Sequence, residues 1–474
     1  WGTRMKKMLM ALSLTGALLG GSAVVWAEEA ASTPVTEQTV AASDAVAAST
    51  VDVVAEAPAP AEAAPAPATE AKVDTGDTAW ILVSTALVLL MTIPGLALFY
   101  GGMVRKKNVL STMMFSLSAA ILVSLIWVIA GYSLAFSGSG AYVGDFAKVM
   151  LNGVAYDALS GTIPESLFVI FQMTFAIITV AIISGSIADR MKYSAFMAFI
   201  AIWVILVYAP ITHWVWAADG WLFKAGALDF AGGTVVHINA GVAGLVAAYM
   251  LGKRAGLGRE SMAPHNLTLT VIGASLIWVG WFGFNGGSAL GAGARASMAI
   301  LVTQVAAAAA AFSWLIAERL VRGKASVLGG ASGAVAGLVV ITPAAGYVGV
   351  GGALIMGLVG GVVCFWGITA LKRLLKADDA LDAFGLHAVG GILGAVLTGI
   401  FYSDEIIKAA NVTLAPTLIE QLKVQVEGVL ATIAYSAVMT FIILKVIDLV
   451  IGIRVSADDE RMGLDLSQHG ERIE

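Results

Sequence analysis

Eleven apolar runs follow residue 76, and each is long enough to cross a lipid bilayer. A membrane-spanning helix needs about 20 mostly apolar residues. Hydrophobic residues make up 59% of the 474 and charged residues 12%, whereas a soluble protein is roughly a quarter charged. We therefore predict an all-α polytopic membrane protein. Its expected spans are residues 78–100, 109–136, 165–187, 193–212, 229–251, 266–286, 296–317, 326–343, 348–370, 384–402 and 425–451.

Charges in the connections between these runs give the chain a direction. Fourteen lysines and arginines lie in alternate connections, Arg105, Lys106 and Lys107 among them, and the intervening connections hold five. Positive charge gathers on the cytoplasmic side of membrane proteins. We therefore expect the N-terminus on the outer side and the segment after residue 452 in the cytoplasm.

The N-terminal region has the pattern of an exported protein. From Met5 it runs through two lysines and an apolar stretch to small residues at Ala27, which is typical of a secretory signal peptide, with residues before Met5 from an upstream start. An uncleaved extra helix is the alternative. Residues 28–75 are rich in alanine and proline and predict a disordered exported tail. The expected domains are a signal peptide at 1–27, that tail at 28–75, a transmembrane domain at 76–452 and a cytoplasmic regulatory tail at 453–474.

Two histidines lie inside apolar runs about 150 residues apart, His237 in the fifth run and His387 in the tenth. When they are aligned, Gly241 matches Gly391 and Gly244 matches Gly394. A unit of five helices is odd, so a second copy enters the membrane from the opposite side. We therefore predict an inverted repeat of spans 1–5 and 6–10 plus a long eleventh helix, with the two histidines facing each other near the midplane.

An ionisable side chain inside a membrane is costly and usually marks a transport pathway. For either ring alone, a core histidine bonded to a backbone carbonyl is the alternative. Two imidazoles without a third histidine or a nearby cysteine make a poor metal site, and Cys364 is the single cysteine, so no metal or other cofactor is expected. Each neutral imidazole has one donor and one acceptor nitrogen, which suits a pore for small polar molecules or protons.

An aspartate precedes each histidine at the point where its helix should begin. Asp229 lies eight residues before His237, and Asp382 lies five residues before His387. We interpret both as N-caps, whose carboxylates accept backbone N–H bonds at the positive end of the helix dipole. For Asp229 the alternative is a charge that attracts a cation from outside, and both roles are compatible.

Seven stretches occur in an order that matches a known family: TIPGLALFYGGMVRKKNVLS, FQMTF, ALDFAGGTVVHINA, GWFGFNGGSA, TPAAGYVGVGGALI, LKRLLKADDALDAFGLHAVGGILGAVLTGIF and RMGLDLSQHGE. Together, over residues 76–474, they resemble the bacterial ammonium transporter (Amt) family. The resemblance implies ammonium uptake by a homotrimer with one pore per subunit. It implies a multi-pass protein of the bacterial inner membrane with a periplasmic N-terminus, a transporter and not an enzyme, with no nucleic-acid partner.

The resemblance also implies an outer recruitment site, an aromatic cage with a hydroxyl. Its residues correspond to Phe175, Trp216 and Ser288. An ammonium ion over Trp216 would gain about 2 kcal/mol of cation–π attraction when desolvated. The segment between Trp216 and the following span is longer than expected for the family, so Trp214 and Trp221 are alternatives.

Below this site the resemblance implies a gate of stacked phenylalanines. They correspond to Phe171 or Phe175 on the third span and to Phe284 on the sixth, for which ordinary packing is the alternative. The pore histidines of the family correspond to His237 and His387, and the resemblance implies that Trp281 and Thr342 line the lower pore.

A mechanism follows as a hypothesis. Moving a bare monovalent ion into a hydrocarbon-like medium costs of the order of 20 kcal/mol. We therefore expect NH4+ to lose a proton at or below the phenylalanine gate, and NH3 to pass along the histidines. Potassium has no proton to lose, which excludes it. Whether the proton follows by another route is open.

The family tail also implies a docked regulatory segment and inhibition by a PII-type signal protein at the basic cytoplasmic loops. Three other functions are alternatives. An ammonium sensor would signal through a domain beyond the tail. A relative could carry methylamine or CO2. An intramembrane metalloenzyme needs more ligands than His237 and His387, and the sequence has no HExxH motif.

Overall fold

The computed structural model describes residues 72–473. The predicted signal peptide, residues 1–27, lies outside the described residues, as does the predicted exported tail up to residue 71. Asp74 caps the first helix, since its carboxylate accepts the N–H of Asp77 at 2.9 Å. The helical bundle therefore begins close to the predicted boundary at residue 76.

Helices make up most of the described chain. The first five-helix unit contains α2 (Thr75–Leu90) with α3 (Ala97–Met103), α4 (Val109–Ile126) with α5 (Tyr132–Phe136), α6 (Glu165–Ile187), α7 (Tyr193–Trp203) with α8 (Ala209–Trp216), and α10 (Asn239–Leu251). The second unit contains α11 (Leu267–Gly287), α12 (Ala294–Arg322), α13 (Val327–Ile341), α14 (Val350–Trp366) with α15 (Lys372–Leu375), and α16 (Val389–Phe401). The remaining elements are the long α18 (Leu418–Ile451), the short α9 (Trp221–Lys224), α17 (Asp404–Ala409), α19 (Ala457–Met462) and α20 (Leu464–His469), and a hairpin of β1 (Leu159–Ser160) and β2 (Ile163–Pro164).

The number of spans agrees with the sequence prediction. Within residues 72–473, ten helices are long and apolar enough to cross a membrane, and α13 is an eleventh, shorter apolar helix of 15 residues. At 1.5 Å per residue α13 is only about 22 Å long, because Pro343 follows its C-cap residue Thr342. The α13 helix alone is shorter than a hydrocarbon core of about 30 Å, so it ends inside the bundle, and the buried turn residues 342–347 continue the span. Thr342 is accordingly fully buried.

The fifth and tenth spans share one design, as the inverted repeat requires. Each begins with a π-helical turn that contains the histidine, Gly233–Ile238 in one and Phe384–Ala388 in the other. Each then continues as an α-helix of 13 residues. Such π-helical turns are rare and occur often at functional sites, because the extra residue re-aims a side chain.

The matched glycines make reciprocal contacts between the two units. A Cβ on Gly241 would lie 2.5 Å from the backbone nitrogen of Ala388, at the start of α16. A Cβ on Gly391 would lie 2.8 Å from the carbonyl oxygen of Gly233, at the start of the fifth span. Only glycine permits so close an approach. These contacts bring the two histidine helices together.

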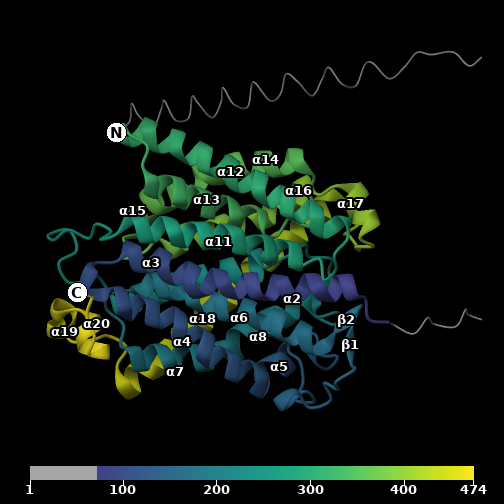
Figure 1. Ribbon diagram of the computed structural model, residues 1–474, viewed down its shortest axis with the longest axis horizontal. Helices are drawn as coiled ribbons and strands as arrows, with labels where there is room; N and C mark the ends of the chain where they lie inside the picture. Colours follow the sequence, from purple (N-terminus) through teal and green to yellow (C-terminus); the bar gives the residue numbers. More distant parts are fainter. Residues whose placement is uncertain (1–71, 474) are drawn as a thin grey trace, which may run out of the picture. The chain divides into compact units, whose positions relative to one another are not determined.

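The described bundle has two functionally distinct ends (Figure 1). The helix α17 and the hairpin of β1 and β2 lie at one end, which we name the vestibule face. The helices α15, α19 and α20 lie at the other, which we name the tail face. Any route across the membrane through the bundle would run from one of these faces to the other.

Candidate functional site

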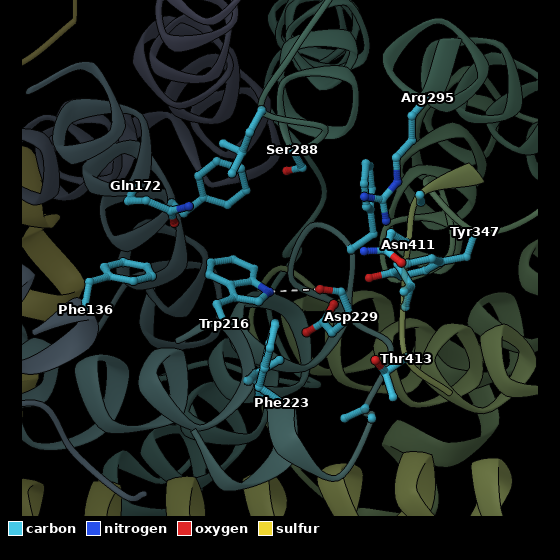
Figure 2. Close-up of a pocket in the computed structure, with 18 of the residues that line it drawn as sticks. Phe136, Gln172, Trp216, Phe223, Asp229, Ser288, Arg295, Tyr347, Asn411 and Thr413 are labelled. Carbon is cyan, nitrogen blue, oxygen red and sulfur yellow. Dashed lines mark hydrogen bonds between the residues drawn. The ribbon is translucent and has the colours of Figure 1, made fainter. Parts of the chain in front are cut away.

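A cavity of about 480 Å³ opens at the vestibule face, and we name it the vestibule. Trp216 at the end of α8, Phe175 on α6 and Ser288 at the end of α11 line it, together with Asp229. Figure 2 shows Trp216 and Ser288 on opposite sides of the same space. The structure thus brings all three predicted recruitment residues together in one cavity.

The three side chains leave groups free to meet a cation. The Trp216 ring is perpendicular to Phe175, with an interplanar angle of 88° and centroids 5.6 Å apart. Its indole Nε1 donates to the carbonyl of Asp229 at 2.9 Å, which fixes the ring (Figure 2). The hydroxyl of Ser288 donates to the carbonyl of Phe284 at 2.8 Å, so its oxygen remains able to accept.

The neighbouring tryptophans have other positions. The indole of Trp214 donates to the carbonyl of Tyr142 at 2.6 Å, and its ring packs on Trp221 at 5.9 Å. Trp221 lines a separate surface groove against α18. Neither lines the vestibule, so Trp216 is the tryptophan that meets the geometric requirement.

The Asp229 side chain caps the start of the fifth span, although Gly232 occupies the N-cap position. The Asp229 carboxylate accepts four backbone N–H groups, those of Gly232 (2.9 Å), Gly233 (2.6 Å), Thr234 (2.8 Å) and Val235 (3.1 Å). These are the orphan donors of a helix start. Four bonds in a buried site fix the loop that follows α9 and leave this carboxylate little capacity for a ligand.

The loop before Asp229 is held from α18. The Gln425 side chain accepts the N–H of Leu228 at 2.7 Å and donates to its carbonyl at 2.9 Å. Gln421 donates to the carbonyl of Gly226 at 2.9 Å. These amide contacts explain how a loop of unusual length can still position Trp216 and Asp229 accurately.

Beneath the vestibule two phenylalanines close the path. The rings of Phe175 and Phe284 lie 4.3 Å apart at 32°. Phe171 meets only the edge of Phe175, at 5.1 Å and 70°, and its ring packs against Gly287. Of the two alternatives on the third span, Phe175 is therefore the partner of Phe284, and Phe171 supports it from behind.

The two histidines face each other below Phe284. Their rings are 5.2 Å apart at 21°, and the Nδ1 atoms are 3.1 Å apart. One Nδ1 must donate and the other accept, so the two rings are in different tautomers. Within residues 72–473 the Nε2 of His237 has no hydrogen-bond partner. The pair is thus a buried, hydrogen-bonded pair of imidazoles in which the Nε2 of His237 is unpaired among the described residues.

Trp281 and Thr342 hold His237 in position. The Trp281 ring stacks on His237 at 5.4 Å and 18°. Its Nε1 donates to the Thr342 hydroxyl at 2.8 Å, and that hydroxyl donates to the carbonyl of Leu338 at 2.7 Å. The Thr342 hydroxyl therefore acts both as an acceptor and as a donor in hydrogen bonds inside the protein. Its place in the structure is that of a support for Trp281.

The helix cap of the tenth span corrects one sequence prediction. Asp379, and not Asp382, accepts the N–H groups of Ala383 (3.2 Å) and Phe384 (2.8 Å), and it also accepts the hydroxyl of Ser186. Asp379 lies eight residues before His387, the same spacing as Asp229 before His237. Asp382 has a positive φ of 62°, and its carboxylate accepts a hydrogen bond from the Lys372 ammonium group at 2.6 Å. Its side chain is therefore an ion-pair partner.

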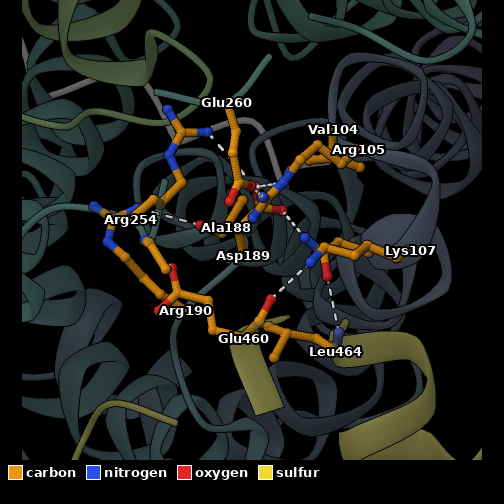
Figure 3. Close-up of polar contacts among 12 residues, drawn as sticks. Val104, Arg105, Lys107, Ala188, Asp189, Arg190, Arg254, Glu260, Glu460 and Leu464 are labelled. Atoms are coloured by element: carbon orange, nitrogen blue, oxygen red, sulfur yellow. Dashed lines mark hydrogen bonds and ion pairs between the residues drawn. The ribbon is translucent and has the colours of Figure 1, made fainter. Parts of the chain in front are cut away.

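Charged groups surround this second cap at the tail face. Arg254 forms a bidentate pair with Asp378, with the shortest contact at 2.8 Å, and approaches Asp189 at 3.7 Å. Burial raises the pKa of Asp378, but the hydrogen bonds and charge of Arg254 outweigh it and leave the pKa below its usual value. Figure 3 shows Arg254 and Arg105 on either side of Asp189.

The C-terminal segment docks onto this network. Asn108 donates to Asp189 and accepts the N–H of Leu464 at 2.8 Å. Glu460 pairs with Arg454 at 2.8 Å, and Lys107 donates to the Glu460 carbonyl at 2.9 Å (Figure 3). Polar contacts therefore run from the tail to the residues beside the tenth span.

Several vestibule residues were not predicted from the sequence. Phe136, Phe168 and Gln172 line the wall behind Trp216, and Arg295 and Tyr347 line the opposite wall. In the sequence, only Arg295 gave a signal, because it is an isolated charge at the start of an apolar run. Among the described residues, no group of three metal-ligating side chains occurs.

Three comparisons with known proteins give consistent relatives. The family model described as Ammonium Transporter Family matches residues 79–473. An ammonium transporter of Bacillus subtilis (strain 168) is 49% identical over 399 residues, which are 84% of this chain and 98% of the relative. An ammonium transporter of Aquifex aeolicus (strain VF5) is 48% identical over 409 residues, 85% and 94% of the two chains.

Solved structures agree. Mep2 of Saccharomyces cerevisiae superposes with a TM-score of 0.75 at 37% identity, over 81% of this chain and 88% of Mep2. A protein described as a sensor Amt protein superposes with a TM-score of 0.77 at 29% identity, over 83% and 98%.

Proposed function

Because this chain belongs to the ammonium transporter family, we propose that ammonium crosses the membrane along the line from the vestibule to the histidine pair. The relatives are transporters and not enzymes. One observation carries the proposal: ring follows ring from Trp216 through Phe175 and Phe284 to the paired histidines.

The first step is recruitment of NH4+ in the vestibule. The ion lies against the Trp216 ring and gains cation–π attraction there, while the Ser288 oxygen accepts one of its N–H groups. Phe175 forms the floor. Each of these three groups offers electron density to a cation without a formal charge of its own, so the ion can leave again.

The second step is loss of a proton at the gate. The contact between Phe175 and Phe284 is dry and apolar, and a bare cation in such surroundings costs many kcal/mol. The neutral molecule NH3 avoids that cost. The free Nε2 of His237 is the acceptor that we propose for the proton, and the Nδ1 pair passes a proton on to His387.

Orientation and location complete the assignment. The basic connections lie at the tail face, which we propose is cytoplasmic in the inner membrane. The vestibule then opens to the periplasm, which suits uptake. The N-terminal export signal supports the same direction.

Assembly and regulation are further parts of the proposal. The family supports a homotrimer, for which native mass spectrometry of the purified protein is the direct measurement. The docked tail and the basic residues around it, such as Lys107 and Arg105, support control from the cytoplasm by a PII-type protein. If the purified protein showed no trimer mass, or bound no PII-type protein, the corresponding claim on assembly or regulation would fail, and the proposed transport path would stand.

The test is current from purified protein in liposomes on a solid-supported membrane, after pulses of ammonium and of potassium. Wild type should give a current with ammonium and none with potassium. His237→Ala should lose the current or its selectivity, and Trp216→Leu should raise the half-saturating concentration. An unchanged His237→Ala variant would refute the relay.

Likeness to a sensor Amt protein keeps one alternative worth measuring. A sensor binds ammonium and passes no flux. Carriage of methylamine or CO2 is the other alternative, and a pH-sensitive dye inside the same vesicles reports neutral flux of any of these gases. Ammonium binding with neither current nor a dye response would favour the sensor.

A further inference from the structure

The vestibule contains a fixed positive charge opposite its cation site. Arg295 is the second residue of α12 and lines the same cavity as Trp216 and Ser288. Figure 2 shows Arg295 and Tyr347 across the cavity from Trp216. Among the described lining residues, Asp229 supplies the one carboxyl group and Arg295 the one guanidinium. One end of this cavity therefore attracts cations while the other repels them.

Arg295 occupies an aromatic slot of its own. Its guanidinium carbon lies 4.8 Å from the ring centre of Phe230 and 5.0 Å from that of Tyr347. The two rings are at 75° to each other, with centres 5.6 Å apart. This is a cation–π site of the kind that an ammonium ion would use, and the protein fills it with its own cation.

The slot is held rigidly. Nε of Arg295 donates to the carbonyl of Gly346 at 3.1 Å. The Phe230 ring presses on Gly346 so closely that a Cβ there would lie 2.1 Å from it. The Phe230 backbone N–H is bonded to the carbonyl of Pro343 at 3.1 Å. The charge is thus fixed in place by packing.

No carboxylate neutralises this charge. Within residues 72–473, no aspartate or glutamate oxygen lies within 4.0 Å of Arg295. Asp229 shares the cavity, but its oxygens are bonded to four backbone N–H groups. Among the described residues, the Arg295 charge therefore has no ion-pair partner.

We propose that Arg295 is a resident cation that sets the affinity and the valence selectivity of the vestibule. It fills the second aromatic slot, so ammonium is bound only at Trp216. Its repulsion raises the half-saturating concentration for every cation, and more for a divalent cation than for a monovalent one, because the energy scales with the product of the charges. This inference rests on the proposed recruitment of NH4+ at Trp216.

The test measures ammonium currents of liposome-reconstituted protein at low and high ionic strength, with N-methylglucamine chloride as the salt. Arg295→Gln should lower the half-saturating ammonium concentration about three- to tenfold at about 0.01 M salt, and Arg295→Lys should stay near wild type. The difference should fall below about twofold at about 0.5 M salt, where the Debye length is only a few Å. Mg²⁺ should inhibit Arg295→Gln at lower concentration than wild type.

Controls separate the possible failures. Thermal unfolding of each variant in detergent shows that it is folded, and Arg295→Lys is the second variant, which keeps the charge in the aromatic slot. Equal shifts in Arg295→Gln and Arg295→Lys, or a shift that salt leaves unchanged, would overturn the charge role. If Trp216→Leu raises half-saturation and Arg295→Gln does not alter it, only this inference fails. If neither variant alters it, the recruitment site itself is wrong.

Discussion

The two histidine helices begin in the same way and are held in different surroundings. Asp229 caps the fifth span with bonds to four backbone N–H groups at the end of an aromatic cavity. Asp379 caps the tenth with two backbone N–H groups and the Ser186 hydroxyl, next to the pair of Arg254 and Asp378. The repeat therefore gives the two histidines equivalent positions, whereas the residues around the two helix starts differ. One end holds the vestibule, where we propose that a cation binds, and the other contacts the tail.

The largest expected effect is at the vestibule cap. Asp229→Ala leaves four buried N–H groups without an acceptor, at about 1–3 kcal/mol each, so we expect a loss of at least about 4 kcal/mol and poor yield of folded protein. Asp379→Ala leaves two N–H groups and the Ser186 hydroxyl without their acceptor, three donors instead of four, so its loss should be smaller. Thermal unfolding in detergent ranks them, with Asp229→Asn as the matched control. A larger loss for Asp379→Ala would break the comparison.

The next effect belongs to the tail face. Arg254→Met leaves the buried carboxylates of Asp378 and Asp189 without their shared partner, at a cost of about 3 kcal/mol. We expect lower thermal stability and faster protease cleavage of the C-terminal segment, with half-saturation by ammonium unchanged. Arg254→Lys keeps the charge, so its thermal stability and its rate of protease cleavage should lie between those of wild type and Arg254→Met. A changed half-saturation would mean that the two ends of the pore are coupled.

A smaller effect is expected between the two ends. Thr342→Val removes the hydroxyl that accepts Trp281 Nε1 and leaves that buried donor unpaired, at about 1–2 kcal/mol. The Trp281 ring then stacks less firmly on His237, so maximal current should fall more than half-saturation changes. Thr342→Ser restores the acceptor and should restore the current. An unaffected Thr342→Val variant would show that ring position is set by packing alone.

The smallest effect is a pH dependence of tail docking. His469 packs on Tyr193 at 5.0 Å, and burial lowers its pKa from 6.5. Docking is then fully supported above pH 6.5 and weakens as pH falls through the lowered docked-state pKa. The hydrogen-exchange protection factors of residues 464–469, which are corrected for the intrinsic pH dependence of exchange, should fall on acidification.

Two variants check this pH dependence. His469→Gln should lose it. Burial raises the pKa of Asp465, which acts in the opposite direction, because docking gains support as pH falls. Protection factors that rise on acidification in wild type and in His469→Gln alike would assign control to Asp465.

Much of this design was visible in the sequence. Apolar length and loop charge predicted the spans, and the spacing of His237 and His387 predicted their contact, because helix periodicity and repeat symmetry are encoded locally. Asp379 was missed, and Asp382 chosen instead, because three aspartates (378, 379 and 382) precede this helix and only the backbone shows which carboxylate meets the helix start. Arg295 was missed because its importance lies in two rings, Phe230 and Tyr347, that are far from it in sequence.

The reciprocal glycine contacts also have a consequence for biosynthesis. Gly241 rests on Ala388 and Gly391 rests on Gly233, so each half of the chain supplies the surface that the other half needs. When the ribosome has delivered only the first five spans, Gly241 lies in an open notch, and His237 has no partner ring. The first half must therefore wait in the membrane for about 140 further residues before its central contact forms. Premature termination after α10 would leave a polar ring facing lipid, which quality-control proteases can recognise.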